Sequence, residues 1–297
     1  MKIQDAASSA ITQEEPPLSL LEALKKAADF LKSQGVPEAR LDSEWLFAHV
    51  LGCERLDLYL NFEQALEKET VDRLRILLKR RAQREPLQYL LGYTPFLNLR
   101  LRTDARALIP RPETELLATL LTQDLLTVPP QSVLDLGTGS GALALALAAA
   151  FPKSSVTAVD LSEQALSLAK ENALASQLHD RVAFLASDWF SAVEGTFDLI
   201  VANPPYLTTA EYASAEAEIR LHEPEQALVA LQHGIADLRL ILTQAQAYLK
   251  PGGLIALETG IDHHPQLSQI AAEFAYGRWE SKTDWNSYQR FFLAWKE

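Results

Sequence analysis

Residues 133–141 read Val133-Leu134-Asp135-Leu136-Gly137-Thr138-Gly139-Ser140-Gly141, an apolar run that passes directly into three alternate glycines. The apolar run favours a buried β-strand, and the long alanine-rich stretch that follows favours a helix. Glycines at such a junction let the backbone turn sharply and let a ligand approach the N–H groups at the start of the helix. The Gly-x-Gly-x-Gly spacing differs from the Gly-x-Gly-x-x-Gly pattern of dinucleotide-binding folds. The sequence therefore predicts a strand, a ligand-binding glycine loop and a helix.

Strand and helix patterns alternate from this segment to the C-terminus, which is typical of a parallel α/β sheet. We predict five strands with helices between them, at Ser132–Leu136, Val156–Asp160, Val182–Leu185, Phe197–Ala202 and Gly253–Glu258. Two further strands, Arg278–Lys282 and Gln289–Trp295, are separated by a turn with no room for a crossover helix. We therefore expect this last pair to be antiparallel. The predicted fold class is α/β, with a mainly parallel sheet.

An all-helical unit is predicted upstream of the sheet. Ser19-Leu20-Leu21-Glu22 is a capping box that opens a helix ending near Gly35, and a second helix ends at Gly52. A third helix is expected from about Gln64 to Arg84. In residues 92–108 apolar and polar side chains alternate, and Pro and Gly interrupt the pattern, which suits a β-hairpin. Along the chain we expect a disordered lead-in at residues 1–16, a helical domain at 17–90, a hairpin linker at 91–108 and an α/β domain at 109–297.

The third predicted helix carries a cluster of basic side chains. Its members are Arg73, Arg75, Lys79, Arg80, Arg81 and Arg84. The simpler interpretation is a solvated helix face. The alternative is a docking face for a partner that carries phosphates or acidic groups.

The composition limits the possible partners and location. The 297 residues include 27 Lys and Arg against 39 Asp and Glu, and the net charge of −12 argues against a broad electrostatic footprint on nucleic acid. A single cysteine, Cys53, fits a reducing compartment. Residues 143–151, the most apolar segment, are too short to span a bilayer. We expect a cytoplasmic, soluble and monomeric protein with no metal, because no His, Cys and carboxylate set has metal-ligand spacing.

A second candidate site follows the apolar strand Phe197–Ala202, where the chain continues as Asn203-Pro204-Pro205-Tyr206. The prolines stiffen the loop, so an acceptor nitrogen can be aimed by the Asn203 side-chain carbonyl and a neighbouring backbone carbonyl. The Tyr206 ring can stack on a planar group. Such a loop suits methylation of a planar amide or amine nitrogen. The alternative is a proline-stiffened surface turn.

Polar and aromatic residues also follow the second and third predicted strands. Asp160, about 20 residues after the glycine loop, is placed to hold both hydroxyls of a ribose. Asp188 offers a carboxylate to an adenine amino group, and the Trp189 indole can stack on the base, although Trp189 alone would also suit a core position. Because open α/β folds bind ligands at the carboxyl edge of the sheet, these residues predict an adenosine-bearing ligand.

Together these motifs resemble the S-adenosylmethionine-dependent methyltransferases of the seven-stranded Rossmann-like class, and more narrowly the peptide chain release factor glutamine-N5 methyltransferases of the PrmC/HemK family. The resemblance covers about residues 17–297. Its most specific elements are Ile109-Pro-Arg-Pro-Glu-Thr-Glu115, residues 135–141, Asp188-Trp-Phe190, residues 203–206, Glu223-Pro224 and Pro251-Gly-Gly253. There are departures, because Ala230-Leu231 and then His233-Gly234-Ile235 stand where Gly-Gly and Asp-Gly-Leu are expected, and His263 replaces the usual Gln.

The resemblance implies methyl transfer from S-adenosylmethionine to the side-chain amide nitrogen, N5, of the glutamine in the Gly-Gly-Gln motif of class I peptide chain release factors, with S-adenosylhomocysteine as product. The implied cofactor-binding residues are Gly137, Thr138, Gly139, Ser140, Gly141, Asp160, Asp188, Trp189 and Asn203. The implied catalytic and substrate-binding residues are Asn203, Pro204, Pro205 and Tyr206. Asn203 and the Pro204 carbonyl would accept the two glutamine N–H groups, while the helical domain and hairpin would grip the release factor.

Two other functions are compatible with these motifs. An amino-methyltransferase that acts on adenine or guanine of DNA or RNA also has a planar amine acceptor, but the net charge and the absence of a target-recognition domain count against it. A non-catalytic module that binds an adenosine ligand is the third possibility. The intact Asn203–Tyr206 motif after the fourth strand argues against that module.

Overall fold

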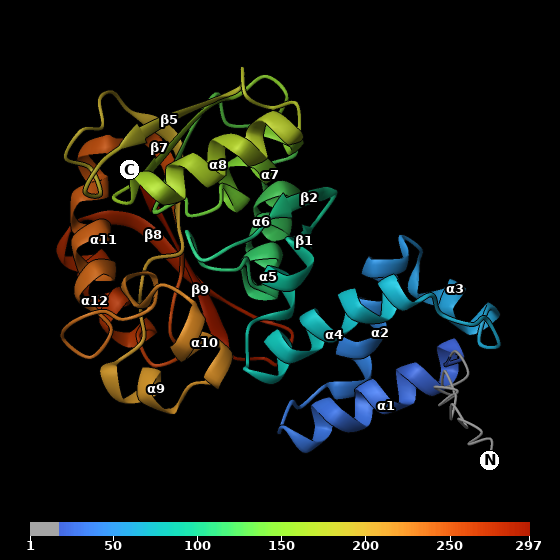
Figure 1. The fold of residues 1–297 in the computed structure, drawn as a ribbon. Coiled ribbons are helices and arrows are strands. Elements are labelled where there is room, and N and C mark those ends of the chain that lie inside the picture. Colours follow the sequence, from blue (N-terminus) through green and yellow to red (C-terminus); the bar gives the residue numbers. More distant parts are fainter. Residues whose placement is uncertain (1–17) are drawn as a thin grey trace, which may run out of the picture. The chain divides into compact units, whose positions relative to one another are not determined.

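The computed structural model describes residues 18–297 and separates the chain into two compact units, Met1–Leu87 and Gln88–Glu297 (Figure 1). The predicted lead-in at residues 1–16 lies outside the described residues. Within residues 18–297, no helix combines the length and the apolar character that crossing a bilayer requires.

The first unit is helical, with α1 at Leu20–Ser33, α2 at Ala39–Leu51, α3 at Arg55–Leu60 and α4 at Lys68–Ala82. The predicted capping box is confirmed, because Ser19 Oγ accepts from the Glu22 N–H at 3.3 Å and a Glu22 carboxylate oxygen accepts from the Ser19 N–H at 3.2 Å. Gly52 ends α2 in the left-handed conformation, with φ at 68°.

The start of the third predicted helix is wrong. Residues 64–66 are extended rather than helical, because they pair with the chain just before α1: the Leu20 N–H donates to the Gln64 carbonyl at 2.8 Å and the Leu66 N–H donates to the Leu18 carbonyl at 3.0 Å. The helix α4 therefore begins only at Lys68. The short helix α3 also lies in a part of the chain where the sequence predicted no helix.

The basic cluster of α4 does not form one solvated face. Arg73, Arg75, Lys79 and Arg80 are exposed, but Arg81 is only 6% exposed. Its guanidinium donates to the Asp42 carboxylate of α2 at 2.7 Å, so Arg81 joins two helices within the unit. The positions of the basic residues along the sequence could not show that Arg81 is buried while its neighbours are exposed.

The second unit contains a seven-stranded sheet with the strand order β5-β4-β3-β6-β7-β9-β8 (Figure 1). Its strands are β3 (Ser132–Leu136), β4 (Ser155–Asp160), β5 (Val182–Ala186), β6 (Phe197–Ala202), β7 (Leu249–Glu258), β8 (Tyr276–Thr283) and β9 (Gln289–Lys296). The strands β3 to β7 pair in parallel, and β9 pairs antiparallel with both β7 and β8. The predicted α/β fold class and its antiparallel last hairpin are confirmed.

Helices and one small hairpin complete this unit. They are α5 (Leu87–Leu91), the antiparallel strands β1 (Tyr93–Phe96) and β2 (Leu99–Arg102), α6 (Pro112–Asp124), α7 (Ala142–Ala150), α8 (Glu163–Ala175), α9 (Thr209–Ser214), α10 (Ala217–His222), a 3₁₀ turn (Glu225–Ala227), α11 (Ala236–Tyr248) and α12 (His264–Glu273). The strand β7 begins at Leu249 instead of Gly253, and its pairing with β6 contains a register shift between Phe197 and Leu199.

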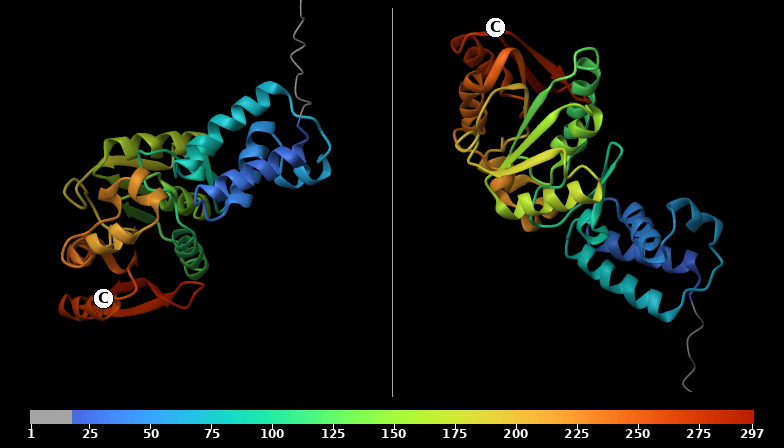
Figure 2. Two further views of the ribbon diagram at one scale, coloured as in Figure 1. Left: turned by 60° about the horizontal axis from the view of Figure 1, so that its bottom comes forward. Right: turned by 90° about the horizontal axis from the view of Figure 1, so that it is seen from above.

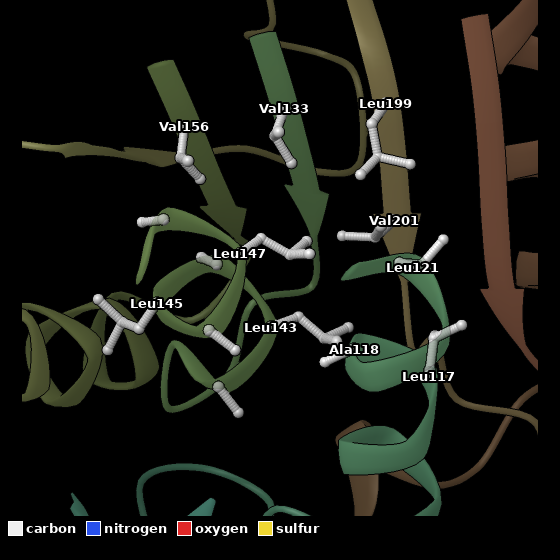
Figure 3. Close-up of a cluster of buried hydrophobic side chains, with 14 of the residues drawn as sticks. Leu117, Ala118, Leu121, Val133, Leu143, Leu145, Leu147, Val156, Leu199 and Val201 are labelled. Atoms are coloured by element: carbon white, nitrogen blue, oxygen red, sulfur yellow. The ribbon is translucent and has the colours of Figure 1, made fainter. Parts of the chain in front are cut away.

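The sheet is covered by helices on both faces, as the views in Figure 2 show. On β6 the burial alternates with a period of two: Leu199 and Val201 belong to one core cluster, while Ile200 and Ala202 belong to the other. Figure 3 shows the first cluster, where side chains from α6 and α7, among them Leu121 and Leu147, lie beside Val133, Leu199 and Val201. Burial on both faces explains why these strands are apolar throughout.

The parallel pairing decides where the functional segments meet. Since β3, β4, β5, β6 and β7 run in one direction, their carboxyl ends lie along the same edge of the sheet. The glycine loop at residues 137–141, Asp160, the residues 187–189, Asn203 and Glu258 all stand at these ends. Open α/β sheets bind ligands at this edge.

Candidate active site

The glycine loop between β3 and α7 is fixed by two carboxylates. Asp135, at 1% exposure, accepts from the Thr138 hydroxyl at 2.6 Å and from the Ala144 N–H at 3.1 Å. Asp160 accepts from the Gly139 N–H at 2.8 Å. The loop is thus attached both to its own strand and to the end of β4.

Burial shifts the proton affinity of both carboxylates. Burial raises the pKa of Asp135 to about 7, although the hydrogen bonds from Thr138 and Ala144 act to lower it. Burial also raises the pKa of Asp160, against backbone hydrogen bonds from Ser162, Gly139 and Leu161. The Ser162 N–H donates to Asp160 Oδ1 at 2.8 Å, while Gly139 uses Oδ2. A carboxylate has about four acceptor positions, so Asp160 retains capacity to accept from hydroxyl groups of a ligand.

Trp189 lies beside the glycine loop. A Cβ atom added to Gly137 would stand 3.4 Å from the Trp189 ring, and the left-handed backbone of Trp189, with φ at 46°, places the indole there. The Ser187 hydroxyl donates to the Trp189 carbonyl at 2.8 Å. Burial raises the pKa of Asp237 on α11, and a hydrogen bond from the Trp189 side chain opposes that rise.

These segments enclose a cavity of about 300 Å³. Nine of the predicted site residues line it: Gly137, Thr138, Gly139, Ser140, Asp160, Asp188, Trp189, Asn203 and Pro205. The other three predicted residues, Gly141, Pro204 and Tyr206, are not part of its lining. Gly141 instead packs between helices, since a Cβ atom there would lie 3.2 Å from Leu145 and 3.3 Å from Ala169.

The loop after β6 is anchored by a hydrogen-bonded network that also involves α6 and β7. Asn203 donates from Nδ2 to Thr114 Oγ1 at 3.0 Å, and the Thr114 hydroxyl donates to Glu258 Oε2 at 2.6 Å. The Tyr206 hydroxyl donates to Glu258 Oε1 at 3.2 Å. Burial raises the pKa of Glu258 to about 7, and burial together with Glu258 raises the pKa of Tyr206.

A second connection ties residues 109–111 to the segment that follows α10. The Ile109 N–H donates to Glu223 Oε2 at 3.0 Å, and the Arg111 guanidinium pairs with Glu223 Oε1 at 2.6 Å. The Glu223 side chain is 1% exposed. Arg111 and Pro224 both line the cavity, so this ion pair holds part of the cavity wall.

Comparison with known proteins identifies the family. A model of the PrmC N-terminal domain matches residues 22–92, and a model of the methyltransferase small domain matches residues 112–234. A release factor glutamine methyltransferase of Deinococcus radiodurans is 42% identical over 279 residues, covering 93% of this chain and 98% of that protein. The chain belongs to the release factor glutamine methyltransferase family. A member from Vibrio cholerae is 38% identical, covering 92% of this chain and 95% of its own length.

Solved structures share the fold of this chain. A 16S rRNA N2 G1207 methyltransferase of T. thermophilus, in complex with AdoMet and guanosine, has a TM-score of 0.51 and 24% identity, and the match covers 69% of this chain and 50% of that one. The hMettl16 catalytic domain in complex with a MAT2A 3′UTR hairpin has a TM-score of 0.55 and 16% identity, covering 84% and 90%. Both likenesses concern the fold alone.

Sequence reasoning did not include Thr114, Glu258 and Asp237 among the residues of the methyltransferase site. Thr114 and Glu258 belong to the network of Asn203, and Asp237 lines the cavity together with Trp189. Glu258 did carry a signal, because it is a carboxylate at the end of an apolar strand. Thr114 carried one only as part of the conspicuous residues 109–115. Asp237 had no signal, since an acidic residue in the first turn of a helix is ordinary.

Proposed function

We propose that this chain transfers a methyl group from S-adenosylmethionine to the side-chain amide nitrogen, N5, of the glutamine in the Gly-Gly-Gln motif of class I peptide chain release factors. The observation that carries the proposal is that Asn203 and Pro205 line the same cavity as the glycine loop. A site for an adenosine-bearing ligand and a loop suited to a planar nitrogen therefore adjoin. The relatives named release factor glutamine methyltransferase support the choice of acceptor.

The residues around the cavity fit S-adenosylmethionine. A volume of about 300 Å³ is at the lower end of the range for small-molecule sites, roughly 300–1,000 Å³. Asp160 would accept from the ribose hydroxyls, Asp188 from the adenine amino group, and Trp189 would stack on the base. Gly137, Thr138, Gly139 and Ser140 would surround the methionine and ribose part. S-adenosylmethionine supplies an electrophilic methyl group on its sulfonium sulfur.

The loop after β6 would align the acceptor nitrogen. The Asn203 side-chain carbonyl and the Pro204 backbone carbonyl would each accept one N–H of the glutamine amide, with Tyr206 packed against its plane. An amide nitrogen is a weak nucleophile, so most of the acceleration would come from alignment and exclusion of water. The two carbonyls would also stabilise the positive charge that develops on the nitrogen. As the new N–C bond forms and the sulfonium S–C bond breaks, the amide nitrogen would release one proton to solvent, with S-adenosylhomocysteine as the other product.

The substrate also suggests a location and a partner. We infer a cytoplasmic enzyme that acts as a monomer on the release factor, with the helical unit contributing to its binding. An adenine or guanine amine remains the alternative acceptor, because the loop would accept either planar group. The net charge of −12 disfavours that acceptor.

A labelling assay tests the proposal. Purified enzyme and methyl-labelled S-adenosylmethionine are offered a class I release factor, its Gly-Gly-Gln variant with glutamine replaced by alanine, or total nucleic acid. Label on the intact factor but not on the variant is the expected result. Label on nucleic acid alone would show that the acceptor is a nucleic acid and not the release factor. The absence of label on every acceptor would reject methyl transfer.

A further inference from the structure

The Glu258 carboxylate accepts hydrogen bonds from two hydroxyl groups that lie in different parts of the fold. Its carboxylate ends β7, is 1% exposed, and accepts from Thr114 of α6 through Oε2 and from Tyr206 through Oε1. Burying a carboxylate is costly unless hydrogen bonds satisfy it. Here both oxygens are satisfied by residues that touch, or belong to, the Asn203–Tyr206 loop. The groups that offset the cost of burying the Glu258 carboxylate therefore lie at the proposed acceptor site.

When Glu258 is ionised, the network fixes the direction of the Asn203 amide. A threonine hydroxyl has one proton, and Thr114 donates that proton to Glu258 at 2.6 Å. Thr114 Oγ1 can then act only as an acceptor toward Asn203, which must present its NH₂ group, at 3.0 Å. The amide oxygen Oδ1 is left for the cavity that Asn203 lines. The two ends of an amide have nearly the same shape, so packing alone would not select this direction.

We propose that Thr114 and Glu258 are positioning residues of the methyl-transfer site, which turn the Asn203 carbonyl toward the acceptor amide and hold the Tyr206 ring beside it. This inference rests on the proposed function, since it assigns a role to groups that would not contact the substrate. With the direction reversed, Asn203 would present N–H to the N–H groups of the acceptor. The donor and acceptor pattern would then no longer match the glutamine amide.

Three variants separate positioning from packing. Thr114→Val keeps the shape of the side chain and removes the hydroxyl, whereas Thr114→Ser keeps the hydroxyl. Glu258→Gln keeps the shape but offers an NH₂ group, which can donate to Thr114 and reverse the polarity of the network. Thr119→Val is the matched control, because Thr119 lies on the same helix and its hydroxyl donates only to the Glu115 carbonyl, at 2.9 Å.

Steady-state kinetics on the full chain give the first readout. We expect Thr114→Val and Glu258→Gln to lower kcat by about 10- to 100-fold, as for a misaligned reacting group. The Kd for S-adenosylmethionine should remain within about twofold of the parent value, and Thr114→Ser and Thr119→Val should stay near the parent kcat. An unchanged kcat in Thr114→Val would overturn the proposal. Equal losses in the serine and valine variants would do so too, since they would indicate a packing role.

A second readout does not depend on the acceptor. In the parent, one side-chain amide proton of Asn203 should exchange slowly with solvent in ¹⁵N-resolved NMR spectra, because it is bonded to Thr114. That protection should disappear in Thr114→Val and remain in Thr114→Ser. If the parent fails to label the release factor, the proposed function is rejected, while retained protection in Thr114→Val would separately reject the positioning role.

Discussion

Asp160 Oδ2 accepts a hydrogen bond from the Gly139 N–H at 2.8 Å, so the carboxylate at the end of β4 holds the glycine loop that leaves β3. The same carboxylate lines the cavity. One side chain thus shapes the loop and faces the proposed ribose position. Its removal should affect the cofactor site both directly and through the loop.

Asp160→Ala should weaken binding of S-adenosylmethionine by about 10- to 100-fold, since hydrogen bonds to a charged group contribute about 1.5–3 kcal/mol. Isothermal titration calorimetry measures the Kd. Asp180→Ala is the matched control, because its side chain is 89% exposed on the same unit, and it should bind as the parent does. Equal affinity in Asp160→Ala and the parent would remove Asp160 from the cofactor site.

Asn203→Ala should reduce turnover more than cofactor binding. The loss of an aligned acceptor is expected to lower kcat by about 10²-fold or more, with the Kd for S-adenosylmethionine changed only severalfold. Single-turnover methyl transfer and calorimetry together give both quantities. Asn286→Ala, in the exposed turn between β8 and β9, should behave as the parent. Turnover of Asn203→Ala at the parent rate would contradict the assignment of this loop.

Glu258 should make stability depend on pH. Burial raises its pKa from the ordinary 4.5 to about 7, so between these values the folded state binds a proton that the unfolded chain does not. The folded state is therefore favoured at low pH, and on the order of 3 kcal/mol is lost as pH rises from about 4.5 to about 7. Relative to the parent, the thermal midpoint of Glu258→Gln should rise by several degrees between pH 5 and pH 8. A pH-independent difference between the two proteins would argue that Glu258 stays ionised throughout.

Gly137→Ala should destabilise the glycine loop because of the backbone conformation at this position. The residue has φ at +69°, where an L side chain costs roughly 1–2 kcal/mol, whereas the new methyl group would only be in ordinary van der Waals contact with the Trp189 ring, at 3.4 Å. We expect a lower thermal midpoint and weaker cofactor binding, accompanied by a changed tryptophan fluorescence. Gly195→Ala is the control, because its φ is +86° but nothing lies within 4 Å of an added Cβ atom. If both variants bind the cofactor equally well, the left-handed backbone at Gly137 is not needed for the cofactor site.

Asp42→Ala should destabilise the helical unit by about 3–5 kcal/mol, because it removes a buried carboxylate that pairs with a buried guanidinium. Both side chains of the Asp42–Arg81 pair are only 7% exposed. Asp72→Ala removes an exposed partner of Arg75, 3.1 Å away, and should change stability by less than about 1 kcal/mol. Denaturant unfolding followed by circular dichroism compares them. Similar losses in the two variants would show that burial of the Asp42 pair adds nothing.

Local patterns in the sequence were sufficient to locate the seven strands of the sheet, but not the short helix α3 or the start of α4. The bounds of β3 and β6 are those predicted, and the Ser19 capping box and the Gly52 helix end are confirmed. These features depend on neighbouring residues, since caps, glycine conformations and apolar runs act over a few positions. The parallel order of the strands then followed from the helices between them. Nine of the twelve predicted site residues line the cavity, because parallel strands end at one edge of the sheet.

Only the tertiary structure decided which distant residues meet. Thr114 and Asn203 are 89 positions apart, and Thr114 and Glu258 are 144 apart, yet together they fix the direction of one amide. Likewise, Arg81 is buried against Asp42, 39 positions away. Residues 64–66, which were predicted to be helical, pair instead with the chain just before α1. Hydrogen bonds between remote side chains have no periodicity along the chain. The sequence by itself determined the elements and the edge at which they converge, whereas packing across the sheet determined the orientation of the groups there.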